Sequence, residues 1–329
     1  MVEARRALEE SQRRRRGCRA VALLLASCGV GLQLAAGHAL AASGGAAEPP
    51  GVSSAPYELS VLSYNTHGLR EFFADDHPEA RFQAIGRLIN AYDVVLLQED
   101  FAYHRILEEL ATHAIRSRGN RQDRNLIADL LAPIVCGECG AGLSTLIDLE
   151  ASSLIRRHRE AYEDYSGWFD SGADAWATKG LLALRVRLPN GAVLDVYNSH
   201  LDAGKKPKRR QDHETRRRQL EQLEGAIRDF SGSGAVIVAG DFNARVDLPH
   251  AALDQFVAAL GLHESGASIP EARWRPRTDY IFYRSDEKSE IELVGVGEAE
   301  EFVDRIGIPL SDHPAIYARF AIRARREAD

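Results

Sequence analysis

Short apolar runs recur along the chain from residue 57 onward, and most of them end at a polar side chain. Residues 234–243, GAVIVAGDFN, show this most clearly, because three β-branched residues are followed by Gly240 and then by Asp241. A run this short and this rich in β-branched residues predicts a buried strand. The same pattern predicts strands at Leu59–Tyr64, Val94–Gln98, Leu143–Leu149, Gly180–Leu188, Val193–Asn198, Thr278–Tyr283 and Ser311–Ile316, and near residues 290–295 and 314–321.

Segments with apolar residues at helical spacing lie between these runs. In Glu79–Ala91, the apolar residues Phe82, Ile85 and Ile89 fall on one face of a helix. The alternation of strands and helices, without an internal repeat, predicts one α/β domain over residues 57–323 with parallel and antiparallel strands. The other expected elements are helices at Phe101–Ala114, Leu126–Val135, Lys208–Phe230 and residues 249–262, and a hairpin turn at Pro189–Gly191.

The first 56 residues differ in composition from the rest of the chain. Met1–Arg19 is rich in arginine, residues 20–42 are small and apolar, and Ala39-Leu40-Ala41 fits a signal-peptidase site. We therefore expect a signal peptide over residues 1–41, a flexible linker over residues 42–56, and a protein that is exported, either secreted or periplasmic. Two alternatives stay open. Leu25–Cys28 resembles a lipoprotein box, which would anchor the protein through a lipidated Cys28, and an uncleaved leader would itself be an anchor.

Charge and cysteine content narrow the function classes. The chain carries 48 acidic and 41 basic side chains, a net charge of −7, so general binding of polyanions is not expected. Lys205–Arg218 is a local exception with eight basic residues, and it is either the solvated face of a helix or a phosphate-binding patch. Beyond the leader the cysteines are Cys136 and Cys139, for which export favours a structural disulfide over a zinc site.

Six of the expected strands carry a carboxylate, a carboxamide or an imidazole at one end. Taken alone, Asp241 and Asn243 are equally well explained by turn chemistry, because Asp and Asn readily hydrogen-bond their own backbone. Six coincidences are harder to explain in this way, and strand ends are where α/β sheets build their sites. We therefore expect the following residues to converge on one pocket: Asn65, Glu99, His200 with Asp202, Asp241 with Asn243, Asp279, and Asp312 with His313.

These residue types suit the hydrolysis of a phosphate ester, which needs a cation on the phosphate, an activated water and a stabilised leaving oxygen. Glu99, with Asn65 and Asp312, supplies the oxygen ligands that Mg²⁺ prefers, and Mn²⁺ or another divalent cation is also compatible. The other roles follow from side-chain chemistry: His313 as general base, Asp279 to fix its tautomer, Asp241 to position the water, and Asn243 and His200 as donors to the phosphoryl oxygens. His67 is expected at the rim, and Asp100 on the opposite face of its strand.

The order of these motifs resembles that of the endonuclease, exonuclease and phosphatase superfamily. The resemblance implies a DNase I-like α/β fold, a four-layer sandwich in which two packed mixed β-sheets are flanked by helices. It also implies hydrolysis of phosphate esters with a divalent metal, by in-line attack of water on phosphorus. The matching pieces cover nearly all of the chain beyond the leader: Asn65, Gln98-Glu99, Asn198-Ser199-His200, Gly240–Asn243, Asp279-Tyr280 and Ser311-Asp312-His313.

Three stretches further resemble the magnesium-dependent neutral sphingomyelinases: His200–Gly204, Gly142–Ser144 and Phe169–Gly180. This resemblance, together with the basic patch, makes Lys179, Asp202 and Arg209 candidate substrate-binding residues. One departure counts against binding to a lipid surface. Secreted bacterial sphingomyelinases carry an aromatic hairpin for membrane docking between the Asp-Phe-Asn and Asp-His motifs, whereas here that interval is short and Trp274 is its only tryptophan.

The sequence thus predicts an exported, Mg²⁺-dependent phosphodiesterase of the sphingomyelinase-like, phospholipase C type. We expect a monomer without an obligate protein partner, whose substrate is a phosphate ester in a phospholipid headgroup or in nucleic acid. An extracellular nuclease that uses the basic patch is one alternative, and a phosphomonoesterase for a small or inositol phosphate is another. A non-catalytic binding module is disfavoured, because each metal and base position is filled by a suitable residue.

Overall fold

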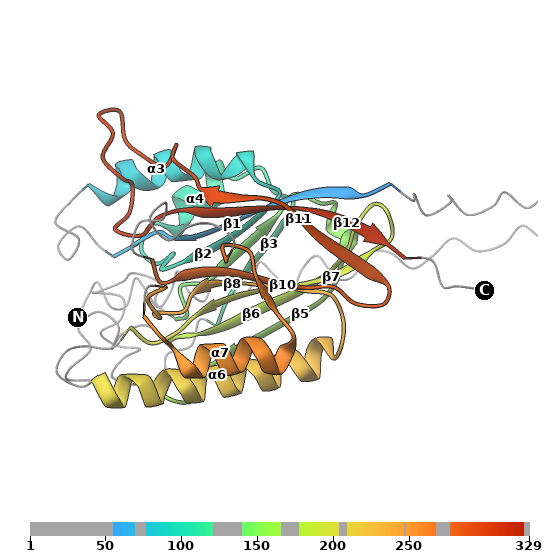
Figure 1. The fold of residues 1–329 in the computed structure, drawn as a ribbon. Coiled ribbons are helices and arrows are strands. Elements are labelled where there is room, and N and C mark those ends of the chain that lie inside the picture. Colours follow the sequence, from blue (N-terminus) through green and yellow to red (C-terminus); the bar gives the residue numbers. More distant parts are fainter. Residues whose placement is uncertain are drawn as a thin grey trace, which may run out of the picture. The chain divides into compact units, whose positions relative to one another are not determined.

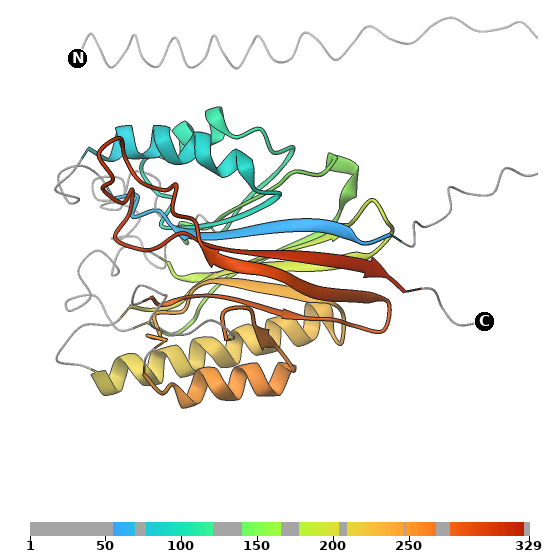
Figure 2. The ribbon, with the colours of Figure 1, turned by 45° about the horizontal axis from the view of Figure 1, so that its top comes forward.

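The described strands form two six-stranded sheets packed face to face, with helices on both outer faces (Figure 1). This computed structural model describes residues 55–69, 77–120, 140–165, 178–203, 209–246, 248–267 and 277–325. The arrangement within these ranges is the four-layer sandwich expected from the sequence. Figure 2 shows the layers from another side, with α6 and α7 covering one sheet and α3 and α4 covering the other.

The first sheet has the strand order β11-β12-β1-β2-β4-β3, in which β1 and β2 are parallel and the other neighbours are antiparallel. The helix between β1 and β2 begins at a proline, whose fixed φ suits the first turn of a helix. The strands are β1 Tyr57–Asn65, β2 Val94–Gln98, β3 Ile115–Arg118, β4 Ser144–Ile147, β11 Ser289–Glu298 and β12 Ile316–Ala324, and the helices are α3 Pro78–Leu88, η1 Ile89–Ala91 and α4 His104–Leu110.

The second sheet has the order β5-β6-β7-β8-β10-β9, and here β7 and β8 are the parallel pair, with α6 between them in sequence. The helix α7 ends at Gly261, which adopts the left-handed conformation common after helices. The strands are β5 Leu154–Ala161, β6 Gly180–Arg187, β7 Val193–His200, β8 Val236–Asp241, β9 His263–Glu264 and β10 Asp279–Arg284, and the helices are η2 Ala151–Ser153, α6 Arg209–Ser231 and α7 Ala251–Leu260.

The core is divided into layers by the alternation of side chains along each strand. In β8, Val236 and Val238 pack under the helices, in the same cluster as Leu223 of α6. Between them, Ile237 points the other way, into the apolar layer between the two sheets. The apolar run of β8 is therefore buried on both faces, which is why it reads as continuous rather than alternating. A third cluster, which includes Phe82, fills the space beneath α3 and α4.

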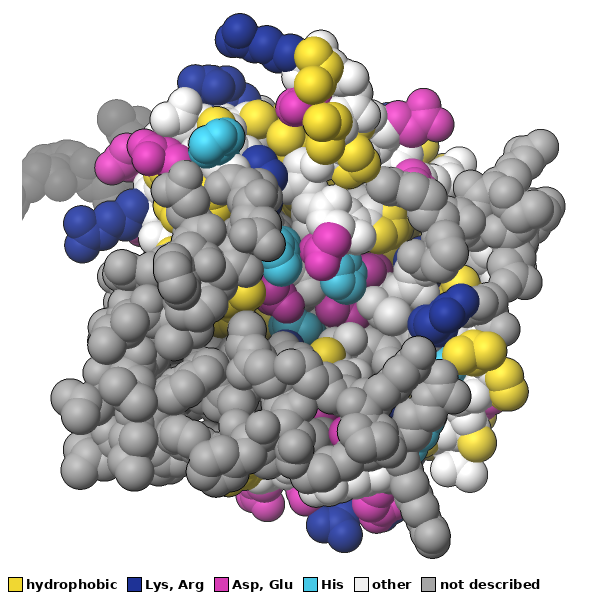
Figure 3. Space-filling view, turned by 90° about the vertical axis from the view of Figure 1, so that its left-hand side faces the viewer, with side chains coloured by type: hydrophobic (Ala, Val, Ile, Leu, Met, Phe, Trp, Pro, Cys, Tyr) yellow, Lys and Arg dark blue, Asp and Glu magenta, His cyan; other side chains and the backbone are white. Residues whose placement is uncertain are grey.

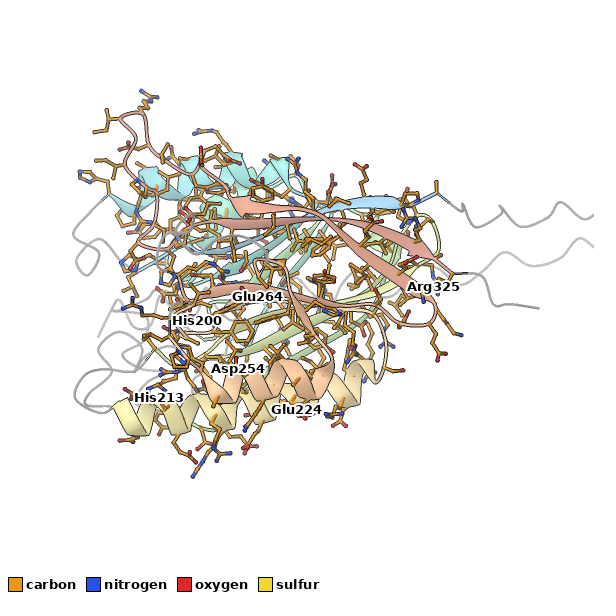
Figure 4. The ribbon with its side chains drawn as sticks, in the orientation of Figure 1. His200, His213, Glu224, Asp254, Glu264 and Arg325 are labelled. Atoms are coloured by element: carbon orange, nitrogen blue, oxygen red, sulfur yellow. The ribbon has the colours of Figure 1, made fainter. Side chains whose placement is uncertain are left out.

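The topology brings the polar strand ends to one edge of the sandwich. The parallel strands β1, β2, β7 and β8 end at this edge. The strands β10 and β12 run antiparallel to β8 and β1, so they begin there instead. His200 lies at this end in Figure 4, whereas Arg325, which follows β12, lies at the opposite end.

Some element predictions were wrong or too long. Ser311–Ile316 is not a strand: the Ser311 hydroxyl donates to the Asn65 carbonyl and accepts from the backbone N–H of His313, so this segment is a loop and β12 begins only at Ile316. The helix expected at Phe101–Ala114 is limited to His104–Leu110, and Leu143–Leu149 shortens to Ser144–Ile147. The strands β3, β5 and β9 were missed.

Several predictions lie outside the described residues and are not tested by the structure. Among the described residues, no helix combines the length and the apolar character that are needed to cross a membrane. The predictions outside the description concern the leader, the helix at Leu126–Val135, the pair Cys136 and Cys139, most of Phe169–Gly180, Trp274, the start of the basic patch, and the side chain of Arg209.

Candidate active site

Backbone pairing places the predicted polar residues beside one another. Asp241, the last residue of β8, pairs with His200 at the end of β7 on one side and with Asp279 at the start of β10 on the other. In the first sheet, Asn65 pairs with Gln98, which directly precedes Glu99. Seen from this edge, histidine and acidic side chains gather in a hollow of the surface (Figure 3).

His313 bridges two buried carboxylates. Its Nδ1 lies 2.9 Å from Asp279 Oδ2, and its Nε2 lies 3.8 Å from Asp241 Oδ2. The side chain of His313 is 23% exposed, whereas those of Asp241 and Asp279 are 2% and 0% exposed. Because Nδ1 is occupied by Asp279, Nε2 is the nitrogen that can exchange a proton with a water molecule. The structure therefore brings together the two residues for which the sequence predicted the roles of base and orienting carboxylate.

The charges of this cluster shift the pKa values of its members. Burial lowers the pKa of His313, but the charges of Asp279 and Asp241 outweigh burial and raise this pKa to about 11. Burial alone would raise the pKa of Asp241, yet the neighbouring His313 and His200 lower it. The pKa of Asp279 is raised, chiefly by burial. Positive charge brought close to these carboxylates would lower the pKa of His313 by the same Coulomb effect.

His200 lies between a lysine and a carboxylate. Lys179, which is buried just before β6, places its Nζ 2.8 Å from His200 Nε2, and Asp241 Oδ2 is 3.4 Å from the same nitrogen. Asn243 Nδ2 donates to the Leu201 carbonyl at 2.8 Å, and the backbone N–H of Asn243 donates to Asp241 Oδ1 at 2.9 Å. The loops after β7 and β8 are thereby joined, and cationic and amide donors lie next to Asp241, an arrangement that suits the binding of anionic phosphoryl oxygens.

Glu99 and Asp312 form the more open side of the site. Glu99 Oε2 lies 3.7 Å and Asp312 Oδ1 lies 3.6 Å from His67 Nδ1, so both carboxylates face one space. Glu99 Oε1 is also 4.0 Å from His200 Nε2. Among the described residues, no group donates a hydrogen bond to the Glu99 carboxylate. Two converging carboxylates, one of them without a hydrogen bond, fit the oxygen coordination of a hard divalent cation.

Asn65 completes this side. Its Oδ1 accepts the backbone N–H of His67 at 3.1 Å, which leaves one lone pair for a cation, and its Nδ2 donates to Asp241 Oδ2 at 3.1 Å. A second grouping of possible ligand atoms, from Asp241, Asp279 and His313, lies within 4.8 Å. We assign that grouping to proton transfer, because Asp279 already uses Oδ2 to orient His313.

Backbone strain is concentrated here. Three non-glycine residues of the described ranges have positive φ, namely His67 at 50°, Glu99 at 53° and Asn243 at 50°, and all three belong to this site. Left-handed backbone costs such residues about 1–2 kcal/mol each, so the surrounding structure must hold it in place. Gly240 is needed for close packing, because a Cβ there would lie 1.8 Å from the carbonyl oxygen of Ser199.

The helix α6 holds the loop that follows His200. Arg216 Nη1 donates to the carbonyls of Asp202 and Ala203, both at 3.0 Å, and Gln219 Oε1 accepts the backbone N–H of Asp202 at 2.8 Å. Burial lowers the pKa of Arg216. Asp202 is itself buried, as part of this loop. Arg209 is the first residue of α6.

The sequence analysis assigned no specific role in the site to two residues that the structure places there. Arg216 reads as part of a solvated helix face, because its neighbours are charged. His67 was expected only at the rim, although it contacts both Glu99 and Asp312. In the sequence, the one signal for His67 is its position two residues after Asn65.

Residues 62–313 match the model of the Endonuclease/Exonuclease/phosphatase family. The chain belongs to this family. The superfamily predicted from the motif order is therefore confirmed, and its sphingomyelinase-like branch is supported by curated relatives. Over 278 residues the chain is 32% identical to proteins named sphingomyelinase from Mycobacterium tuberculosis and Mycobacterium bovis. The match covers 79% of this chain and 52% of the relatives, so the chain spans about half the length of the curated relatives it matches.

Solved structures of the same fold confirm the DNase I-like sandwich. Sphingomyelinase C from Streptomyces griseocarneus superposes with a TM-score of 0.55 at 19% identity, over 80% of this chain and 99% of that one. A beta toxin mutant from Staphylococcus aureus with bound magnesium ions has a TM-score of 0.56 at 14% identity, over 82% and 100% of the two chains. A humanized TDP2 from D. rerio is also similar, with a TM-score of 0.56 at 19% identity over 80% and 98%.

Proposed function

We propose that this family member is a Mg²⁺-dependent phosphodiesterase of sphingomyelinase-like type, which cleaves a phospholipid on the diacylglycerol or ceramide side of its phosphate. The observation that carries the proposal is the meeting of His313, Asp279 and Asp241 with His200 and Glu99 at one edge of the sandwich, through contacts of 2.9 to 4.0 Å. This set provides a base, its orienting carboxylate and a cation ligand. The mycobacterial relatives are named for the same chemistry.

Each residue has its own role in the proposed reaction. Glu99, Asp312 and Asn65 would hold the Mg²⁺, which supplies positive charge to the phosphate and its leaving oxygen. The positive charge of the cation would lower the raised pKa of His313. In its neutral form His313 then takes a proton from the attacking water at Nε2, while Asp279 keeps the proton on Nδ1. Asp241 accepts a hydrogen bond from that water and so directs it at phosphorus. The P–O bond to the lipid breaks, and the lipid oxygen leaves with the bonding electron pair and takes a proton from solvent to become the alcohol. His200, Lys179 and Asn243 donate hydrogen bonds to the phosphoryl oxygens.

The loop between β11 and β12 provides an argument for a lipid substrate. It carries three aliphatic side chains with high exposure: Val303 at 37%, Ile306 at 80% and Ile308 at 56%. Asp304 orders the loop, because its Oδ1 accepts the backbone N–H groups of Ile306 and Ile308. Hydrophobic side chains gather at the top of the face that carries the site (Figure 3). An exposed apolar patch in the loop that leads to the proposed catalytic histidine suits binding to a lipid surface. This patch could take the place of the aromatic hairpin, whose absence counted against lipid binding in the sequence analysis.

The described part of the basic patch does not favour a nuclease. Arg217 is paired with Glu214 and Glu221, and Arg218 with Glu214 and Asp164. The third arginine of this run, Arg216, is buried and holds the loop after His200. Because the charges of Arg217 and Arg218 are paired with carboxylates and Arg216 is buried, these three arginines offer little unpaired positive charge to attract a phosphate backbone.

We also propose that the protein is exported. The motivation is the leader, whose arginine-rich start and apolar stretch end at Ala39-Leu40-Ala41. Mass spectrometry of the amino terminus after expression in a bacterial host separates three outcomes. A start just after Ala41 supports a secreted or periplasmic protein, a lipidated start at Cys28 supports an anchored one, and retention of Met1 in the cytoplasm would refute export.

The activity is tested by offering sphingomyelin vesicles, plasmid DNA and p-nitrophenyl phosphate side by side, with Mg²⁺ and with EDTA. We expect hydrolysis of sphingomyelin that EDTA abolishes. Glu99→Gln should raise the Mg²⁺ requirement sharply, because it removes the carboxylate that faces the open side of the site. Cleavage of DNA or of the monoester instead would replace the lipid proposal with a nuclease or phosphomonoesterase, and activity indifferent to EDTA would refute the metal site.

A further inference from the structure

Asp100, the residue after Glu99, is buried on the side of the chain that faces away from the site. Its side chain is 0% exposed. Its Oδ2 accepts two short hydrogen bonds, from Ser144 Oγ and from His104 Nδ1, both at 2.5 Å. Ser144 begins β4 and His104 begins α4. One carboxylate oxygen therefore ties the end of β2 to a neighbouring strand and to a helix.

The backbone of the same turn is held from both sides. The Glu99 carbonyl accepts the backbone N–H groups of Gly68 at 3.0 Å and Phe101 at 2.9 Å, and the N–H of Asp100 donates to the Gly142 carbonyl at 2.9 Å. Gly68 packs so closely that a Cβ would lie 2.3 Å from the Glu99 carbonyl oxygen. These contacts surround the residue whose φ is 53°, so they act where the chain most needs support.

A buried carboxylate is a costly way to stabilise a fold. Removing an ionised group from water costs several kcal/mol unless hydrogen bonds compensate, and apolar replacements of buried charges are often neutral or stabilising. At Asp100 only Oδ2 is hydrogen-bonded, since the buried Oδ1 has no partner among the described residues. Asp100 is also one of the residues that line a small cavity of about 70 Å³. This cost indicates that Asp100 does more than stabilise the fold.

We propose that Asp100 is a positioning residue for Glu99. Anchored on Ser144 and His104, it keeps the turn at Glu99 left-handed and the Glu99 carboxylate directed toward His67 and His200. It thereby sets the affinity of the site for a divalent cation. Without this anchor, the turn at Glu99 leaves the left-handed conformation in a fraction of the molecules. The apparent affinity for the cation then falls in proportion to the fraction of molecules that can still bind it. This inference rests on the proposed function, in which Glu99 holds the cation.

The experiment is calorimetric titration of the full chain with Mg²⁺, together with thermal unfolding. We expect Asp100→Leu, which removes the acceptor but fills the space, to raise the Kd for Mg²⁺ about tenfold. The control is Asp93→Leu at the opposite end of β2, where the carboxylate accepts hydrogen bonds from Ser60 N at 2.7 Å and Ser60 Oγ at 2.6 Å. Asp93→Leu should lower the Tm but leave the Kd within twofold of wild type.

Milder variants keep the test decisive if Asp100→Leu does not fold. Ser144→Ala and His104→Ala each remove one anchor and should each raise the Kd about threefold. The inference is overturned if the anchor variants bind Mg²⁺ as wild type does, or if Asp93→Leu weakens binding equally. Glu99→Ala separates this failure from a failure of the proposed function: if Glu99→Ala binds Mg²⁺ like wild type, Glu99 is not a ligand and the metal site itself is wrongly placed.

Discussion

Asp279 and His313 come from segments attached to different sheets and meet through a hydrogen bond of 2.9 Å. Asp279 is the first residue of β10 in the second sheet, whereas His313 lies in the loop that leads into β12 of the first sheet. The orientation of the proposed base therefore depends on how the two sheets pack. This explains why the site lies over the apolar layer between the sheets rather than within one sheet.

The first prediction concerns this pair. His313→Ala should lower kcat by roughly 10²-fold or more, because proton transfer from the attacking water loses its acceptor. Asp279→Asn should lower kcat to a comparable extent, because the imidazole loses the carboxylate that fixes its tautomer. The measurement is Mg²⁺-dependent hydrolysis, with thermal unfolding to show that the fold is kept. His263→Ala, an exposed histidine on β9, is the control and should leave kcat unchanged. Full activity in His313→Ala would remove this residue from the mechanism.

The second prediction uses two glycines in one parallel crossover. Gly240→Ala should destabilise the protein by about 3 kcal/mol or more, because its Cβ would collide with the Ser199 carbonyl at 1.8 Å. Gly225→Ala should instead stabilise by about 0.5–1 kcal/mol, because nothing lies within 4 Å of a Cβ at this position in α6 and Ala restricts the unfolded chain. Urea unfolding measures both changes. Equal effects would show that the close approach at Gly240 is not a constraint.

The fold was predictable wherever a strand or helix buries an apolar face. The sequence predicts β8 clearly because both faces of this strand are buried. It predicts α6 because Leu220, Leu223 and Ile227 line one side of the helix. The edge strand β5, LIRRHREA, has no buried residue, so no period of two in hydrophobicity reveals it. β3 has only four residues and follows a helical segment without a turn signal.

The candidate site was predictable as far as it consists of strand ends. Parallel neighbours bring such ends together, so a polar residue after each apolar run was sufficient to find Asp241 and Glu99. The contribution of His67 depends on a left-handed turn, and that of Arg216 depends on a tertiary contact of a helix. Neither feature can be predicted from the local amino-acid composition. A charged residue in the polar half of α6 looks the same in sequence whether it is solvated or buried.

The third prediction distinguishes the three consecutive arginines of α6. Arg216→Ala should cost about 1–3 kcal/mol of stability and should lower kcat, because the carbonyls of Asp202 and Ala203 lose their donor and the loop after His200 loosens. Arg217→Ala and Arg218→Ala remove exposed ion pairs on the same helix and should leave the free energy of unfolding nearly unchanged, because solvent screens such pairs. Kinetics with thermal unfolding of the three variants makes the comparison, and a uniform response would contradict the assigned role of Arg216.

The last prediction concerns the exposed loop before the Asp-His motif. If Ile306 and Ile308 enter a lipid surface, the double change Ile306→Ser with Ile308→Ser should reduce hydrolysis of sphingomyelin vesicles roughly tenfold or more, because burying each side chain contributes about 1.5–3 kcal/mol. Hydrolysis of a soluble phosphodiester such as p-nitrophenyl phosphorylcholine should be unchanged, since neither residue has a role in the proposed reaction. Val294→Ser is the matched control, because this valine of β11 is also 56% exposed but lies outside the loop. Equal losses on vesicles and on the soluble ester would show that the loop supports the catalytic residues instead of binding lipid.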